Sequence, residues 1–334
     1  MYTDSHTHLN SPQLFPDYQK HIQDFLEVWW VWLSIIWTHL EDSITALEIC
    51  RDVLVAGPNN WQLYIGATIG YHPEFARDYD ISKLEELILR DRGQVETPPL
   101  ADNLDKARSG WQSVIIWIGE IGTDLYREPY HAFYEEQKKA FYDQCVLAQK
   151  YNLPVIIHSR NDFAGSMDVL RSVIPSGMER SGMKSRDLDN GAQNKPFKIY
   201  FHCRWYTTQE LEVLHNLIKH NQNLELYIGF CGNISYPKAQ DLRDSFAYCL
   251  DNNINVLVET DAPYLSAQAI RGQQNTPAKI IHTYEYISDY FNIPIIGLQK
   301  KTHDNFMSLY YPTSAIASGA AAVIASGAKQ SGTT

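Results

Sequence analysis

The residues of this chain with the clearest potential for chemistry are two histidines near its start, His6 and His8. On an extended segment, side chains two positions apart point to the same face, so the two imidazoles can converge on one point. Imidazole nitrogen is a ligand that suits zinc, copper, iron and nickel. Because histidines near a terminus are also common as solvated side chains, a metal site requires further ligands downstream.

Further imidazole and carboxylate side chains follow short apolar runs along the chain. They are His72, Glu120, His158, His202 and Asp261. If each apolar run is a strand of one parallel barrel, these side chains lie at the C-terminal strand ends, where barrel enzymes build their active sites. Each alone has an ordinary alternative: a solvated strand end for His158, a salt bridge for Glu120, a turn cap for Asp261. Four histidines and the two carboxylates of such a set are enough to bind two divalent metals.

The pattern of apolar runs and amphipathic segments predicts a (β/α)₈ TIM barrel, with the metal site at the C-terminal face of its strands. An open doubly wound sheet has the same alternation, but no G-x-G-x-x-G follows the first strand, so the barrel is favoured. The predicted strands are Tyr2–Thr7, Leu33–Trp37, Leu63–Ile69, Ser113–Ile118, Pro154–Ile157, Lys198–Phe201, Leu224–Ile228 and Asn255–Val258. The predicted helices are Ser43–Arg51, Ile81–Arg90, Tyr134–Tyr151, Thr207–His220 and Tyr236–Asn252, with Ser43 and Thr207 as N-caps.

The length of 334 residues suits one barrel, and 44% hydrophobic residues are enough for a large core. We expect residues 1–312 to form the barrel domain and residues 313–334, rich in Ala, Ser, Gly and Thr, to form a peripheral tail. Residues 93–110 and 175–195 read as exposed insertions.

The formal net charge of -11 argues against broad adhesion to nucleic acid, although it allows a local cationic cleft completed by metal ions. The five cysteines form no close C-x-x-C pair and no secretory signal is evident, which predicts reduced thiols in a cytoplasmic protein. The apolar run 28–37 is shorter than the roughly 20 residues that span a bilayer. We therefore expect no membrane association, and no obligate protein partner is evident.

Four segments carry a family resemblance. They are residues 4–9 (DSHTHL), 119–127 (GEIGTDLYR), 154–160 (PVIIHSR) and 259–265 (ETDAPYL). In this order they resemble the signature blocks of the TatD family of metal-dependent deoxyribonucleases, within the amidohydrolase-like barrels. Residues 271–277 resemble a further block and Asn305 a position in the last helix, so the resemblance runs from the first residues to about Tyr311.

The resemblance implies a role for each candidate ligand. His6 and His8 would bind one metal ion, His158 and His202 would bind a second, Glu120 would bridge both, and Asp261 would bind the first and accept a proton. The chemistry agrees, because a carboxylate can bridge two cations and lowers the cost of holding them close. Other amidohydrolase-like enzymes use a carboxylated lysine as the bridge, so a glutamate favours the TatD branch. The ligands admit zinc, manganese, iron or magnesium.

The resemblance also implies a 3′→5′ exodeoxyribonuclease acting on single-stranded DNA or on 3′ ends. His72 would contact a substrate phosphate, and Arg127, Arg160 and Arg271 are candidates for phosphate contacts through their planar donors. Each arginine could equally hold a structural carboxylate. Glu259 is expected to orient a metal-binding histidine.

Several positions depart from the family pattern or invite another interpretation. Cys203 follows His202 but is expected to be inert, as a cysteine after a buried strand usually is. The segment Arg204-Trp205-Tyr206 is bulkier than the family pattern and leaves substrate choice open. Large rings also stand where relatives carry smaller residues, at Trp32, Trp37 and Trp117. Overpacking of a protein core costs about 1–3 kcal/mol per site unless the neighbouring side chains are smaller. A hydrolase of another small ester or amide, or a non-catalytic metal-binding barrel, are the alternatives.

Overall fold

The computed structural model describes residues 2–27, 30–36, 38–56, 64–94, 113–174, 196–203, 207–221 and 223–310. Residues 95–110 and 175–195, the segment 204–206, Trp37 and the side chain of Trp32 lie outside the described parts. So does the tail 313–334. The division into a barrel domain and a tail therefore stays a prediction.

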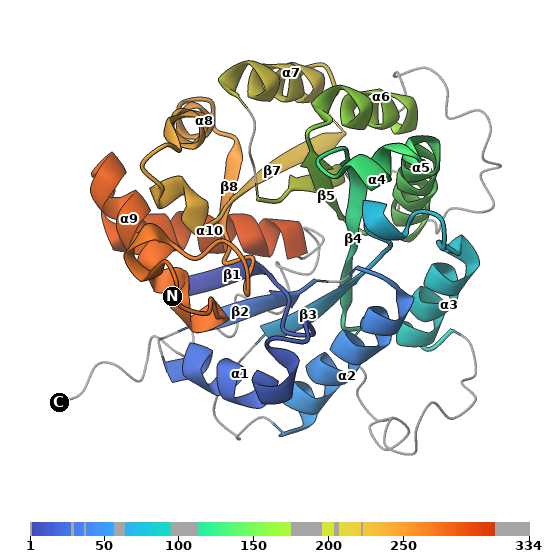
Figure 1. Ribbon diagram of the computed structural model, residues 1–334, viewed down its shortest axis with the longest axis horizontal. Coiled ribbons are helices and arrows are strands. Elements are labelled where there is room, and N and C mark those ends of the chain that lie inside the picture. The colour runs from blue at the N-terminus through green and yellow to red at the C-terminus, as the bar shows by residue number, and fades with distance from the viewer. Residues whose placement is uncertain are drawn as a thin grey trace.

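Eight parallel strands form one sheet in which each strand pairs with the next along the chain, so the (β/α)₈ prediction is confirmed (Figure 1). The strands are β1 (Tyr2–Thr7), β2 (Trp30–Ile35), β3 (Tyr64–Ile69), β4 (Ile115–Asp124), β5 (Val155–Arg160), β6 (Phe197–Phe201), β7 (Leu224–Phe230) and β8 (Asn255–Val258). In β4, β7 and β8 the apolar runs are buried on both faces almost throughout, as parallel strands require.

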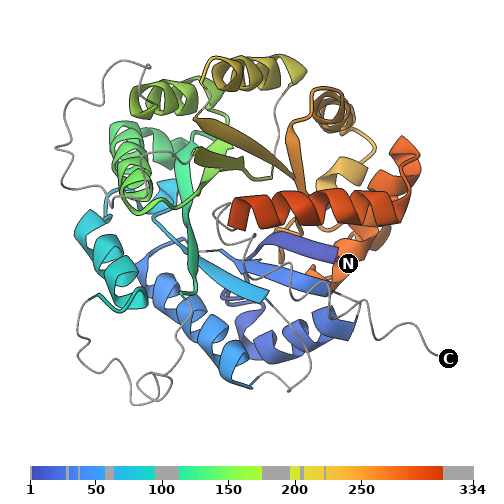
Figure 2. The same ribbon diagram turned by 180° about the vertical axis from the view of Figure 1, so that it is seen from behind.

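Helices surround the strands, and α10 lies across one end of the barrel (Figure 2). The α-helices are α1 (Tyr18–Glu27), α2 (Leu40–Ala56), α3 (Ile81–Asp91), α4 (Glu128–His131), α5 (Tyr134–Tyr151), α6 (Phe163–Val173), α7 (Thr208–Lys219), α8 (Gln240–Asp251), α9 (Ile280–Phe291) and α10 (Ile295–Tyr310). The 3₁₀ turns are η1 (Phe15–Asp17), η2 (Pro73–Phe75), η5 (Gly232–Ser235), η6 (Gln268–Ile270) and η7 (Pro277–Lys279). Among the described residues, no helix has the length and apolarity needed to cross a membrane.

Of the two predicted N-caps, one is right. Thr207 caps α7 through a capping box, because its hydroxyl accepts from the backbone N–H of Glu210 and the Glu210 carboxylate accepts from the backbone N–H of Thr207. Ser43 is not a cap, since α2 already begins at Leu40. The Ser43 hydroxyl instead donates to the carbonyl oxygen of His39 four residues earlier, the usual bond of a serine inside a helix.

Strand β4 is longer than the apolar run Ser113–Ile118 indicates. It continues through Asp124 because β5 keeps pairing with it, with Gly122 opposite His158. Gly122 has a φ of +145°, and a Cβ there would lie 1.8 Å from the carbonyl oxygen of His158. Only glycine allows the two strands to approach so closely. Glu120 is therefore inside a strand and not at its end, which corrects that prediction.

Besides a small cluster of Ala76, Tyr130, Phe133 and Ala140, the described core has two main parts. The larger lies between the strands and the surrounding helices, and the smaller brings together side chains of the strands and of α10. In the smaller part the Trp117 ring packs edge-on against Tyr200 and Phe306, with centroids 5.9 and 5.5 Å away. Trp117 is fully buried, so the large ring expected to overpack the barrel is enclosed by other aromatic rings. Its indole Nε1 has no hydrogen-bond partner in the described chain.

The barrel closes where β1 meets the segment after β8. The backbone N–H of Asp261 donates to the carbonyl oxygen of His6 at 2.9 Å, and that of His8 donates to Ala262 at 2.8 Å. Below these bonds the buried Asp4 carboxylate accepts from the hydroxyl and the backbone N–H of Thr260, at 2.6 and 2.9 Å. Closure therefore places the two N-terminal histidines beside an aspartate some 250 residues away in sequence.

Candidate metal centre

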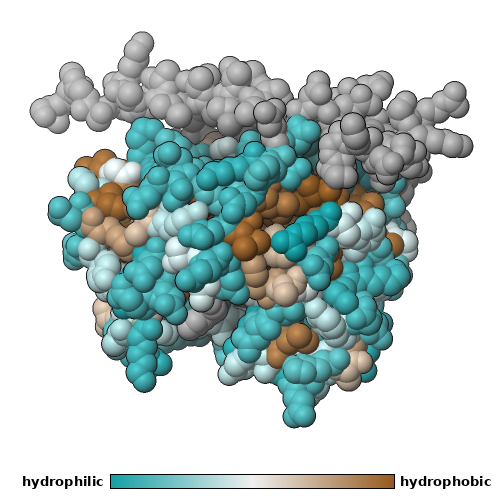
Figure 3. Space-filling model, turned by 90° about the horizontal axis from the view of Figure 1, so that it is seen from above, coloured by the Kyte–Doolittle hydropathy of each residue, from teal (hydrophilic) through white to brown (hydrophobic). Residues whose placement is uncertain are grey.

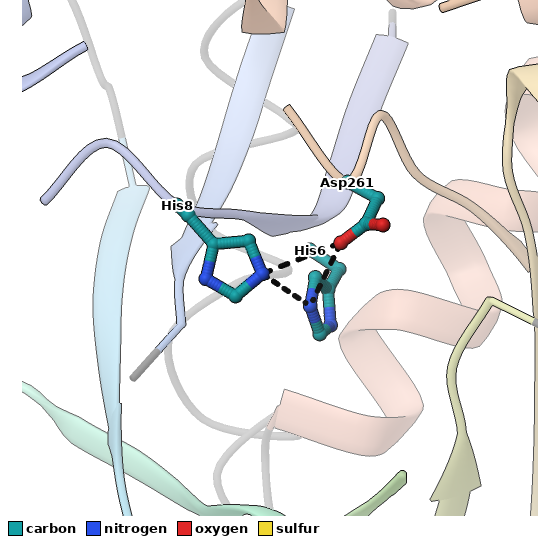
Figure 4. Close-up of side chains that lie close together, drawn as sticks. All are labelled: His6, His8 and Asp261. Carbon is teal, nitrogen blue, oxygen red and sulfur yellow. Dashed lines mark hydrogen bonds and ion pairs between the residues drawn. The ribbon is translucent and has the colours of Figure 1, made fainter. Parts of the chain in front are cut away.

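The first group of donor atoms gathers at the seam between β1 and β8. The Nε2 atoms of His6 and His8 lie 3.3 Å apart, and both face Oδ1 of Asp261, at 3.5 and 3.3 Å (Figure 4). Oε1 of Glu120 completes the group, 3.1 Å from His6 and 3.3 Å from His8. Two imidazoles and two carboxylates thus turn one atom each toward a common centre.

A second group lies on the other side of Glu120. Its Oε2 atom is 3.2 Å from Nδ1 of His158 and 3.0 Å from Nε2 of His202. The two ring nitrogens are 3.3 Å apart. Glu120 therefore presents a different oxygen to each pair of histidines. All six side chains predicted as ligands lie in these two groups.

The spacing of these atoms fits divalent metals. Ligand bonds of about 2.0–2.2 Å in tetrahedral geometry keep neighbouring ligand atoms about 3.3–3.6 Å apart, and six-coordination brings them to about 3 Å. The donor distances of 3.0–3.5 Å match that range. Within each group two imidazole nitrogens face each other, and at most one of them can donate to the other; a cation between them satisfies both lone pairs. The residues therefore fit a metal centre.

The orientation of His158 depends on a residue that the sequence did not reveal. Oδ2 of Asp124 is 3.1 Å from Nε2 of His158, which leaves Nδ1 to face Glu120. Such a carboxylate fixes the tautomer and the ring orientation of a ligating histidine. Asp124 and Glu120 are four residues apart on β4, and strand periodicity puts them on the same face. This four-residue spacing is the signal in the sequence that could have placed Asp124 near the metal centre.

The two carboxylates of the centre are ionised in the folded chain. Burial alone would raise the pKa of Glu120, but electrostatic interactions with the His202 and His6 imidazoles, and hydrogen bonds with His158 and His202, outweigh it and hold the pKa well below the usual value. Burial likewise opposes ionisation of Asp261, and its hydrogen bond with His8 lowers the pKa in spite of that. Burial opposes the charging of His158 too, yet the bonds to Asp124 and Glu120 raise its pKa to about 9. The centre therefore presents negatively charged carboxylate oxygens between its imidazoles.

His72 lies at the edge of the second donor group. Its ring centroid is 4.4 Å from that of His158, in an edge-to-face arrangement. Burial and the neighbouring His158 lower its pKa to about 3, so the ring is neutral. Nδ1 accepts the backbone N–H of Glu74 at 3.2 Å, which places the ring proton on Nε2.

The three arginines predicted to contact substrate lie at different places. Arg160 ends β5, two residues after His158, and its guanidinium covers the Tyr126 ring at 3.6 Å. Arg127 donates to the Tyr130 hydroxyl at 3.3 Å. Arg271 covers the Tyr236 ring at 4.5 Å. Within the described ranges, neither of the last two makes a hydrogen bond or ion pair with a residue of the donor groups.

Glu259 and Cys203 lie beside the centre without a direct bond to its histidines. Glu259 accepts from the Tyr200 hydroxyl, from the backbone N–H of Cys203 and from the Cys231 thiol. Its carboxylate comes within 4.8 Å of ring nitrogens of His6 and His202, so its role in orienting a histidine stays a prediction. A bond with Cys231 favours the Cys203 thiolate, but burial and the nearby carboxylates of Asp261, Glu259 and Glu120 together outweigh it and raise the pKa to about 11, as an inert thiol requires.

A small part of the centre remains exposed to solvent. The donor side chains are mostly buried, and His158 is the most open of the six. Figure 3 shows the molecule from the side of the barrel, with a hollow between two lobes at the bottom of the picture. That edge is the end of the barrel that faces the viewer in Figure 1. The opposite end is covered by α10 (Figure 2).

Comparison with known proteins gives consistent matches over the barrel. Two relatives are each named as an uncharacterized metal-dependent hydrolase. One is YcfH of Escherichia coli K12 and the other is a protein of Mycoplasma pneumoniae. YcfH is 28% identical over 208 residues, which cover 62% of this chain and 67% of YcfH. The Mycoplasma protein is 24% identical over 314 residues, covering 93% and 99%.

The crystal structure of YjjV, a TatD homologue from E. coli K12, superposes with a TM-score of 0.69 at 21% identity and covers 93% of this chain and 98% of its own. That likeness shows a shared fold. A family model described as TatD related DNase matches residues 3–311. The chain therefore belongs to the TatD related DNase family, a family of metal-dependent hydrolases.

Proposed function

We propose that this protein is a metal-dependent phosphodiesterase that hydrolyses DNA, as a 3′→5′ exonuclease, with two divalent cations held by the two donor groups. One observation carries the proposal. Glu120 directs Oε1 to His6 and His8 and Oε2 to His158 and His202, all at 3.0–3.3 Å. A carboxylate shared in this way fits two cations side by side, and zinc, manganese and magnesium are the candidates.

Two cations held by these donor groups would supply activation of a water molecule and stabilisation of the attacking and leaving oxygens of a phosphoester. Asp261 is the proton acceptor of the chain. Its carboxylate is ionised and faces the first group, so it can take a proton from the attacking water. Glu120 holds the two halves of the site together and supplies negative charge to both.

His72 and the arginines would bind the substrate phosphates. The neutral His72 ring carries its proton on Nε2 and can donate it to a phosphate oxygen. Arg160, beside the second group, would contact the scissile or the adjacent phosphate with its planar donors. Arg127 and Arg271, farther along the rim, would contact phosphates that follow in the strand. The substrate is single-stranded DNA or the 3′ end of a duplex.

We further propose a cytoplasmic location and no obligate partner. All five cysteines are present as thiols, which suits a reducing compartment. The acidic net charge of -11 means that attraction to DNA must come from the metal centre and the neighbouring arginines.

The test combines metal analysis with an exonuclease assay. The purified protein is expected to hold about two equivalents of metal, to lose oligonucleotide hydrolysis on chelation and to regain it when zinc, manganese or magnesium is added. An oligonucleotide labelled at its 5′ end reports polarity, because a 3′→5′ enzyme shortens the labelled strand progressively. Hydrolysis that ignores the chelator overturns the proposal. Cleavage of acyl esters without oligonucleotides would assign another substrate class, and bound metal without any cleavage would assign a binding protein.

A further inference from the structure

Exposed tyrosines on the described surface fall into two kinds. Tyr142 and Tyr290 lie on the outer helices α5 and α9. Tyr126 and Tyr264 are more exposed, at 57% and 53%, and both lie within a few residues of the metal centre. Large aromatic rings kept in water beside a polar site are typical of binding surfaces.

Tyr126 stands next to the second donor group. Its backbone N–H donates to Oδ1 of Asp124 at 2.7 Å, the same carboxylate that orients His158. One face of its ring is covered by the Arg160 guanidinium at 3.6 Å, and more than half of the residue remains in solvent. Because Arg160 and His158 are two apart on β5, they share a strand face. The stacked pair therefore sits above the His158 side of the centre.

Tyr264 stands next to the first donor group. Its backbone N–H donates to the carbonyl oxygen of Asp261 at 2.8 Å, and its ring lies edge-on to His8, with centroids 5.8 Å apart. The buried Asn275 side chain donates to the carbonyl oxygens of Tyr264 and Thr260. The backbone that carries this exposed ring is thus fixed in place, so little conformational entropy is lost when a ligand stacks on it.

We propose that Tyr126, with Arg160 behind it, and Tyr264 are stacking surfaces for unpaired nucleobases on the two sides of the metal centre. This inference rests on the proposed phosphodiesterase function and specifies its substrate: single-stranded nucleic acid or a frayed end, whose bases are free to leave their own stack. Stacking on an aromatic ring is tolerant of sequence, since every base has a π face. The guanidinium of Arg160 can stack on Tyr126 and still direct N–H donors at a phosphate.

The kinetic test replaces each ring and measures hydrolysis of a short single strand. Losing one base contact of about 1–3 kcal/mol predicts a rise in KM of about 5- to 150-fold for Tyr126→Ala and for Tyr264→Ala, with kcat little changed. Tyr126→Phe keeps the ring and should restore the KM. Tyr142→Ala, which removes an exposed tyrosine from α5, away from the metal centre, is the matched control and should leave the KM unchanged.

The substrate side of the test removes the base instead of the ring. An oligonucleotide with abasic sites at its last two positions should bind the wild type more weakly, and the alanine variants should lose nothing further on it. A 2-aminopurine base at the same positions should be quenched on binding to the chelated wild-type protein, and less so by Tyr126→Ala and Tyr264→Ala. This fluorescence reports stacking without catalysis.

The outcomes separate the two proposals. If the wild type cleaves oligonucleotides but treats abasic and normal strands alike, or if the alanine variants keep the wild-type KM and quenching, the stacking inference is wrong while the phosphodiesterase remains. If no oligonucleotide is cleaved with any metal, the proposed function fails, and unchanged 2-aminopurine fluorescence would remove the stacking surfaces as well.

Discussion

The two ends of this barrel are built from the same strands but do different work. On β5, Ile156 belongs to the inner apolar cluster and His158, two residues on, to the metal centre. On β6, Tyr200 and His202 repeat the relation. Strand side chains alternate with a period of two, so one strand face passes from the apolar cluster to the donor groups within about 7 Å. We call the apolar cluster around Trp117, Tyr200 and Phe306 the floor of the barrel, and the two donor groups its mouth.

Stability and chemistry are expected to reside at opposite ends of the barrel. The floor removes aromatic surface from water and stabilises the fold at about 25 cal/mol per Å² of apolar area. The mouth buries imidazoles and carboxylates, and desolvation of such groups opposes folding unless they are paired or bind a cation. We therefore expect substitutions at the mouth to reduce activity with little loss of stability, and substitutions at the floor to do the reverse.

The largest effect is expected from Asp261→Asn. The amide cannot accept the proton of the attacking water, so kcat should fall about 10²- to 10⁴-fold. The free energy of unfolding of the chelated protein should change little, because the amide fills the same space and removes a buried charge. Denaturant unfolding and single-turnover hydrolysis measure the two quantities. Asp251→Asn, at an exposed helix end, is the control; a rate near that of the wild type for Asp261→Asn would remove this residue as the base.

Phe306→Ala is the counterpart at the floor. Phe306 is fully buried on α10 against Trp117, and truncating such a ring typically costs about 3–5 kcal/mol of unfolding free energy. The rate per folded molecule should stay near that of the wild type, since the ring lies at the far end of the barrel. Thermal unfolding together with activity at low temperature checks this. An activity loss larger than the unfolded fraction would show that the two ends are coupled.

A smaller effect on the mouth is expected from Asp124→Asn. Losing the charge behind His158 should weaken metal binding about 10- to 100-fold, as for other carboxylates that orient a ligating histidine. In the chelated protein Asp124 also raises the pKa of His158 toward 9, so the variant should titrate at lower pH. Calorimetry with zinc and an NMR titration of the ring protons measure the two changes. An unchanged His158 titration would contradict the orienting role.

The amino-acid pattern predicts the barrel well because its signal is local. Short apolar runs and amphipathic segments recur along the chain, and the strands Tyr2–Thr7 and Asn255–Val258 have the predicted bounds. The predicted end of β4 is wrong because the continuous apolar run stops at Ile118, whereas strand pairing with β5 continues to Asp124. Pairing is a property of two segments, and one run cannot reveal it.

The candidate site likewise has residues that the local sequence pattern predicts and contacts that depend on strand pairing. The six predicted ligands lie together because each follows or belongs to a barrel strand, although their metal-binding role stays a prediction. The bond from Asp124 to His158 and the cover of Arg160 on Tyr126 depend on which strand neighbours which. The four-residue spacing of Glu120 and Asp124 indicates a shared strand face, but it does not indicate that Asp124 contacts His158. Contacts between side chains of adjacent strands follow from strand pairing, which a single stretch of sequence does not determine.

The smallest effect is expected from Trp117→Phe, a second substitution at the floor. The indole is fully buried and its Nε1 has no hydrogen-bond partner in the described chain, a deficit that costs stability. Phenylalanine keeps an aromatic ring against Tyr200 and Phe306 but leaves a small cavity, so gain and loss should offset each other to within about 1.5 kcal/mol. Denaturant unfolding of the variant beside Phe306→Ala measures the difference. A loss as large as that of Phe306→Ala would mean that ring volume alone determines the stability of this end, and that the unpaired indole N–H contributes nothing.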